Sequence, residues 1–198
     1  MKTSWKQFAW ILVCACAPLA FAQTSAVDAA LLAKANAGDA TAQVAVGEQF
    51  VQAAEAIHDR AQVAANYKQA EAWYRKAAEQ NYIPGELHLA AFYRDGGKNL
   101  QRDMAQAVVW YRKAAEQGDA YAQGTLGVLY SIGQGVERNN VEAYFWLDLA
   151  ASVKGPNQEK YAANRQMVGT HITAEELADV QDRVATWKAA HPKAKATE

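Results

Sequence analysis

Cysteine is nearly absent from this sequence of 198 residues, because the only two, Cys14 and Cys16, lie close to its beginning. Beyond them, no disulfide bond within the chain can stabilise the fold, which must depend on a hydrophobic core. A chain of this length can bury such a core as one domain. Residues 23–191 are predicted to form that domain.

Long apolar runs are scarce as well, and the clearest one, Phe8–Leu19, is well short of the roughly 20 residues that span a bilayer. It follows Lys2 and Lys6 and precedes Ala20-Phe21-Ala22. This order is typical of a secretory signal peptide, here residues 1–22, that is cleaved after export. We therefore expect a periplasmic or secreted protein with no transmembrane segment after cleavage.

One alternative to cleavage after Ala22 is a lipid anchor on Cys16, in the context Val13-Cys14-Ala15-Cys16. It is less favoured, because lipoprotein sites usually have another residue where Cys14 stands. The intact mass of the exported protein distinguishes the two.

Histidine is too rare to suggest a metal site. The four histidines, His58, His88, His171 and His191, stand far apart and form no His-x-x-His or His-Glu-x-x-His pattern. Gly-x-Ser-x-Gly, a Walker loop and a dinucleotide fingerprint are also missing. The sequence therefore predicts no catalytic, cofactor-binding or metal-binding residues.

Neither sign of charge dominates. Without Lys2 and Lys6 the chain keeps 18 basic residues against 21 acidic ones, a formal charge of −3. Two basic pairs recur, each followed by a glutamate: Arg75-Lys76 with Glu79, and Arg112-Lys113 with Glu116. This mixture is typical of a solvated helix face, whereas nucleic-acid binding needs clustered positive charge. We expect no nucleic-acid partner.

What the sequence does contain is a repeat. The string Trp-Tyr-Arg-Lys-Ala-Ala-Glu-Gln occurs at 73–80 and again at 110–117, and a weaker copy follows around Trp146. Such a short unit cannot bury its own apolar face and must stack on its copies. We predict three units, at about 38–80, 81–117 and 118–152.

The second half of each unit has the apolar spacing of a helix. Positions 0, +3, +4, +7 and +8 are apolar in all three copies, beginning at Ala70, Ala107 and Ala143. Their tryptophans, Trp73, Trp110 and Trp146, are therefore expected between helices and not on a sugar-stacking surface. Capping boxes are predicted to begin these helices at Asn66, Asp103 and Asn139, with Gln69, Gln106 and Glu142 three residues later.

A first helix precedes each of these, and in it large and small residues recur in register. Tyr93 and Tyr130 represent the large positions. Gly47, Ala90 and Gly127 represent the small ones. We expect a neighbouring helix to approach too closely at the small positions for a larger side chain.

Several of these segments together resemble the Sel-1-like repeat, a relative of the tetratricopeptide repeat. The resemblance rests on Gly118–Gln123 with Leu126-Gly127 and Tyr130, on Gly133–Val136 and on Ala143–Ala151, and it covers about Gly38 to Ser152. It implies an all-α fold, a right-handed α/α superhelix, or solenoid, of stacked antiparallel helix pairs. Some exported relatives carry a disulfide in each helix pair, and this chain departs from them.

Both ends of the stack are expected to be covered. Residues 28–37 are predicted as an N-terminal cap helix, and 157–168 and 173–191 as C-terminal capping helices. Leu149 stands where the earlier copies have Lys76 and Lys113, which indicates that another element covers it. Pro192 ends the last helix, and 192–198 is expected to be a disordered tail.

The first unit also carries extra residues between Phe50 and Asn66. Because Gln52–Ala65 has no Gly or Pro, the insertion is expected to lengthen the first helix pair. It is interpreted as tolerated length variation, with a projection that contacts a partner as the alternative.

The function that these features favour is a non-enzymatic scaffold that binds a protein or peptide partner in the cell envelope. Some relatives have been linked to β-lactam compounds, so the alternative is a binder or hydrolase of peptidoglycan or a β-lactam-type ligand; no Ser here has Lys three residues on. In relatives the exposed side of the first helices often lines the concave face. This implies partner binding at Glu86, His88, Gln123 and Thr125.

Overall fold

The structure is a computed structural model that describes residues 27–96 and 101–192. The predicted signal peptide, Cys16 and nearly all of the predicted tail lie outside these residues. The described part of the chain contains nine helices and no strand: α1 (Ala29–Asn36), α2 (Ala40–Ala56), α3 (Arg60–Ala78), α4 (Ile83–Asp95), α5 (Met104–Glu116), α6 (Ala120–Ile132), α7 (Asn140–Ala151), α8 (Gln158–Gly169) and α9 (Ala174–Ala190).

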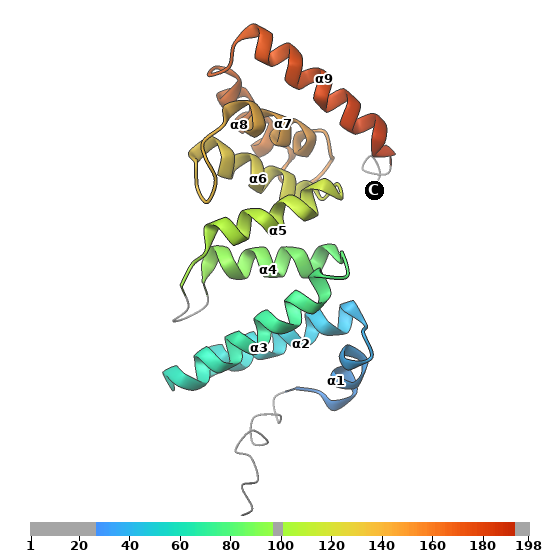
Figure 1. Ribbon diagram of the computed structural model, residues 1–198, viewed down its shortest axis with the longest axis vertical. Coiled ribbons are helices and arrows are strands. Elements are labelled where there is room, and N and C mark those ends of the chain that lie inside the picture. The colour runs from blue at the N-terminus through green and yellow to red at the C-terminus, as the bar shows by residue number, and fades with distance from the viewer. Residues whose placement is uncertain (1–26, 97–100, 193–198) are drawn as a thin grey trace, which may run out of the picture.

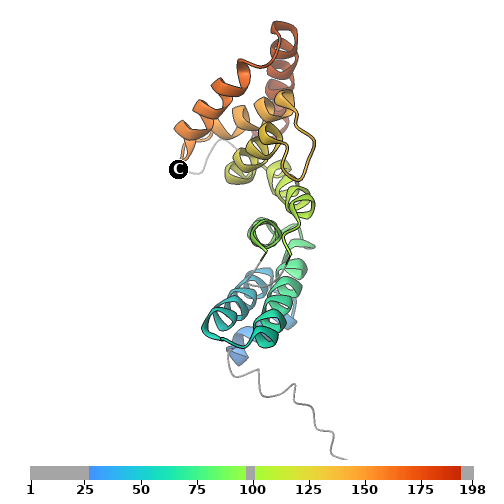
Figure 2. The same ribbon diagram turned by 90° about the vertical axis from the view of Figure 1, so that its left-hand side faces the viewer.

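The helices α1 to α8 are stacked in chain order, so that each packs mainly on its neighbours in sequence (Figure 1). The pairs α2/α3, α4/α5 and α6/α7 form the body of the stack, and α9 packs on α7 at the C-terminal end. Figure 2 shows that the stack follows a curved path. The predicted all-α solenoid is confirmed.

Short polar side chains begin most of the helices. Asp103 and Asn139 begin α5 and α7 as predicted, and each accepts a hydrogen bond from the backbone amide three residues later, at 3.0 Å. The predicted capping boxes are not completed there, because the amides of Asp103 and Asn139 donate to the carbonyls of Tyr93 and Tyr130. Thr173 and Glu176 form a complete capping box at the start of α9. The helix α4 differs, because Tyr82 makes no capping bond there and Pro84 occupies its first turn.

The prediction that Asn66 begins the second helix of the first unit is wrong. α3 begins seven residues earlier, capped by Asp59, whose Oδ1 accepts from the amide of Gln62 at 2.8 Å. Asn66 is buried inside the helix. Since nothing between Asp59 and Asn66 interrupts a helix, α3 extends back to the first available cap.

The insertion lengthens both helices of the first pair. α2 has 17 residues and α3 has 19, against 13 and 13 for α4 and α5. The extension has its own small core, in which Ala54, Val63 and Tyr67 are buried against Phe92 of α4. The extra residues therefore pack on the stack.

The tryptophan stripe forms the core, as predicted. Trp73, Trp110 and Trp146 are 7%, 6% and 4% exposed. The small positions are sites of close approach, since a Cβ atom on Gly47 would lie 2.5 Å from Cε1 of Tyr74. Ala90, in the same register, is completely buried.

One repeated contact changes its chemistry at the end of the stack. Arg75 of α3 donates to the hydroxyl of Tyr93 of α4, and Arg112 of α5 donates to that of Tyr130 of α6. In the third copy the equivalent residue is Asp148, which accepts from Arg165 of α8 at 2.5 Å and from Lys188 of α9 at 3.1 Å. Leu149 beside it is only 1% exposed. The capping helices α8 and α9 thus bind a negative side chain of α7, whereas the inner junctions use a positive one at the equivalent position.

Replacing Asp148 with Ala is expected to lower the free energy of unfolding by about 1–2 kcal/mol, because it leaves two partly buried cations without their carboxylate. Hydrogen exchange should increase first in α9. Urea denaturation and hydrogen exchange measure both effects. Asp179→Ala, an exposed carboxylate on α9, is the charge-matched control, and equal effects of the two changes would contradict the assigned role.

Candidate functional site

Two of the four predicted partner-binding residues are not on the surface. Glu86 and Gln123 are 0% and 1% exposed, so the prediction that they line an exposed face is wrong. Gln123 Nε2 donates to the backbone carbonyl of Ala115 at 3.1 Å, at the end of the preceding helix. These positions close the junction between units, which requires that they face inward.

The other two are half-buried. The His88 ring stacks on Tyr74 with ring centroids 4.9 Å apart, and its Nε2 lies 3.3 Å from Oε1 of Glu48 on α2. His88 therefore belongs to the contact of α4 with both helices of the first pair, α2 and α3. Thr125 lies on α6, where its side chain is partly accessible.

Thr125 is part of an exposed stripe along α6 that the sequence did not reveal. Tyr121 and Ile132 are 44% and 60% exposed, and Thr125 and Val128 are half-buried between them. The spacing of 4, 3 and 4 residues places all four on one helix face. α6 contains no Asp, Glu, Lys or Arg. We call Tyr121, Thr125, Val128 and Ile132 the α6 stripe.

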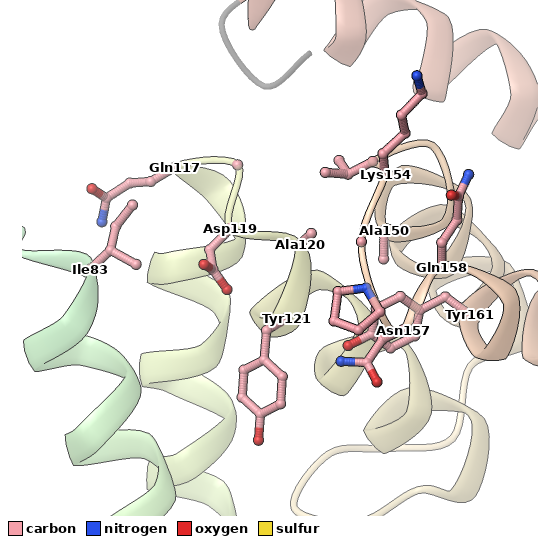
Figure 3. A pocket seen from close by; sticks show the side chains of 14 residues that line it. Ile83, Gln117, Asp119, Ala120, Tyr121, Ala150, Lys154, Asn157, Gln158 and Tyr161 are labelled. Atoms are coloured by element: carbon pink, nitrogen blue, oxygen red, sulfur yellow. The ribbon is translucent and has the colours of Figure 1, made fainter. Parts of the chain in front are cut away.

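A pocket of about 470 Å³ adjoins the beginning of this stripe. It lies between the start of α6 and the loop that joins α7 to α8, with Tyr121 at its edge (Figure 3). Asp119 and Gln117 lie on one side, and Lys154 and Asn157 lie on the other. Its size is within the range of small-ligand sites, about 300–1,000 Å³, and its polar groups can bind the backbone or a polar side chain of a peptide.

Arg94 holds the hydroxyl of Tyr121 in place. Arg94 Nη1 donates to the hydroxyl of Tyr111 at 2.9 Å and to that of Tyr121 at 3.2 Å. Hydrogen bonding by Arg94 also lowers the pKa of Asp95, and burial raises the pKa of Tyr111. Tyr111 therefore stays neutral and Arg94 stays charged at neutral pH, so the ring of Tyr121 is held in place.

The described residues contain no group of three or more His, Cys, Asp or Glu side chains placed to bind a metal ion. Over residues 27–96 and 101–192, no helix combines the length and the apolar character needed to cross a membrane. The arrangement around α6 is thus an uncharged stripe that begins at a pocket with polar side chains on two sides.

Comparison with solved structures found chains of the same architecture. One is the crystal structure of a protective antigen present in uropathogenic Escherichia coli strains, described as displaying an SLR fold: it is 26% identical with a TM-score of 0.57, and the alignment covers 83% of this chain and 41% of that one. This chain thus spans about two fifths of the antigen's length. Another is a Sel1 repeat protein from Oxalobacter formigenes, 28% identical with a TM-score of 0.55, for which the alignment covers 69% of this chain and 95% of that one.

Two further comparisons concern sequence. A search of curated proteins found no match. The family model for the Sel1 repeat matches residues 41–82, 84–119 and 120–152, which together exceed half of the chain and contain the tryptophan stripe, the close-approach glycines and the α6 stripe. The chain therefore belongs to the Sel1 repeat family.

Proposed function

We propose that this protein is a non-catalytic scaffold that binds a protein or peptide partner through the α6 stripe and the pocket beside Tyr121. The observation that carries the proposal is the uncharged, accessible face of α6, on which Tyr121 and Ile132 are 44% and 60% exposed. Family membership supports it, since Sel1 repeat proteins are generally scaffolds for protein–protein interaction. Because residues 1–22 have the pattern of a secretory signal peptide, we also propose that the complex forms in the cell envelope.

The mechanism would be preorganisation. The described helices are held by buried tryptophans and by junctions such as Arg112 to Tyr130, so the binding face needs little ordering when a partner docks. Association loses less conformational entropy when the surface is already fixed. Tyr121 adds a rigid aromatic contact of the kind enriched at interfaces.

The test begins with photo-crosslinking in cells. A crosslinker at Thr125 of the α6 stripe is expected to capture a specific partner, whereas one at Val109, an exposed residue of α5, is expected to capture none. Capture of the same proteins from both positions contradicts the proposed face. Hydrolysis of nitrocefin or muropeptides by purified protein, abolished by a point change, would support the enzymatic alternative.

With the partner purified, Ile132→Glu is expected to weaken binding by about tenfold or more, because a charge would be buried in an apolar contact, and each ~1.4 kcal/mol is a factor of ten. Calorimetry or biolayer interferometry measures the Kd. Val109→Glu introduces the same charge at a residue that is 46% exposed on α5, and it should leave the Kd unchanged. Equal loss in both variants would indicate a nonspecific charge effect.

A further inference from the structure

Glutamine side chains close the junctions between successive helices. At three junctions a Gln near the start of one helix donates its amide to a backbone carbonyl at the end of the helix before it. Each bond is 3.1 Å long: Gln43 to Ala35, Gln123 to Ala115, and Gln158 to Ala151. The carbonyl groups of a final helical turn have no partner within their own helix, so this bond satisfies one of them.

The junction between α3 and α4 has a glutamate in this position. Glu86 follows Ala78 by eight residues, the same separation as in Gln43 with Ala35 and Gln123 with Ala115. The backbone is also equivalent, because the carbonyl of Ala78 accepts from the amide of Asn81 at 3.0 Å. The carbonyl of Ala115 accepts in the same way from Gly118, also at 3.0 Å.

The second oxygen of the side chain has an equivalent partner as well. Oε2 of Glu86 accepts from Nε2 of Gln117 at 2.7 Å. In the first unit Oε1 of Gln43 accepts from Nε2 of Gln80 at 2.8 Å. The two networks therefore correspond, and this correspondence assigns Oε1 of Glu86 to the place of the amide nitrogen of Gln43.

That oxygen is the difficulty for an ionised glutamate. Glu86 is 0% exposed, and its Oε1 has no hydrogen-bond partner among the described residues. A carboxylate can only accept hydrogen bonds, so it cannot bind a carbonyl oxygen. A protonated carboxyl group has an O–H donor and can replace the glutamine amide.

We propose that Glu86 carries a proton in the folded protein and donates it from Oε1 to the carbonyl of Ala78, so that the junction of α3 and α4 weakens when this proton is lost. The three glutamine junctions have no such dependence, because an amide does not titrate. The stack would then have one joint that responds to pH.

The surroundings of Glu86 support a proton near neutral pH. Burial, with a smaller contribution from Glu116 of α5, raises the pKa of Glu86 to about 7, although Lys113 of α5 and the hydrogen bond from Gln117 act in the opposite direction. From α3 the group at this junction is the uncharged Ala78 carbonyl. The other titratable groups of α4 have partners of their own. His88 faces Glu48 of α2, Tyr93 binds Arg75 and Glu71 of α3, and Arg94 pairs with Asp95.

The sign of the pH effect follows from linkage. In the unfolded chain a glutamate loses its proton near its ordinary pKa of 4.5, whereas in the folded chain Glu86 keeps it until about pH 7. The stabilisation by this proton is complete below about pH 4.5 and is lost as the pH rises through about 7. Glu86 therefore makes the fold less stable at pH 8 than at pH 5.

The direct test is a carboxyl ¹³C NMR titration of the intact protein, with the Glu86 signal assigned by its loss in Glu86→Gln. The expected midpoint is near pH 7. A midpoint below about 5, close to an ordinary glutamate, would overturn the proposal.

Thermal melts test the consequence for stability. Glu86→Gln introduces the residue found at the other junctions. The Tm of this variant minus that of the wild type is therefore expected to be larger at pH 8 than at pH 5, by roughly 5 °C or more. Gln43→Glu, whose side chain would receive the matching bond from Gln80, is expected to add a second pH-dependent loss. His88→Gln should keep the wild-type dependence on Glu86, because it removes only the imidazole. Parallel pH profiles for the wild type and Glu86→Gln would overturn the proposal.

Discussion

Replacing Trp110 with Ala is expected to lower the free energy of unfolding by about 3–5 kcal/mol. The indole is 6% exposed and lies in the central core cluster that the helix pairs share. Its Nε1 has no hydrogen-bond partner among the described residues, so the loss comes from packing and from the cavity that remains. The ammonium group of Lys113, 4.1 Å from the ring centroid, also loses its contact.

Urea denaturation followed by circular dichroism measures this effect. The control is Val109→Ala, a neighbouring residue of α5 that is 46% exposed, for which a change within about 0.5 kcal/mol is expected. If Trp110→Ala unfolded at the same urea concentration as the wild type, the stack could not depend on this stripe.

Replacing Gly127 with Leu is expected to cost about 3 kcal/mol. A Cβ atom on Gly127 would lie 2.6 Å from Cγ of Leu147, 3.0 Å from the carbonyl oxygen of Ala143 and 3.1 Å from the backbone nitrogen of Leu147. Two of these three atoms belong to the backbone of α7. The clash therefore cannot be relieved by a side-chain rotation, and α6 must move away from α7.

The matched control is Gly155→Leu, because a Cβ atom there would meet nothing within 4 Å. Thermal melts of both variants should show a large loss of Tm at Gly127 and little change at Gly155. A similar Tm for the two variants would contradict the close approach of α6 and α7.

The fold could be predicted because its determinants recur. The tryptophans and the small residues of each unit hold fixed positions relative to one another, so three copies supply the evidence that one alone would not. The start of α3 could not be found this way. Asn66 aligns with the true caps Asp103 and Asn139, but only the preceding turn shows that Asp59 begins the helix first.

The candidate site was harder to predict from the sequence than the fold, because polar residues in helices are normally expected to be exposed. Glu86 and Gln123 are instead hydrogen-bonded inside the junctions, and their partners include a backbone carbonyl and a side chain from the neighbouring helix. The prediction that they are exposed therefore rotated α4 and α6 incorrectly about their own axes. Once Gln123 is placed inward, Tyr121 and Ile132 fall on the accessible side of α6.

The exchange of arginine for aspartate at Asp148 has a consequence for engineering longer arrays. Units inserted as copies of residues 81–117 would carry Arg112 and Tyr93, so each new boundary would reproduce the guanidinium-to-phenol contact of the native ones. Copies appended after α7 would instead place a phenol opposite Asp148, which now binds Arg165 and Lys188. The negative charge of Asp148 thus fixes the C-terminal limit of the array, and residues 81–117 are the cassette to duplicate.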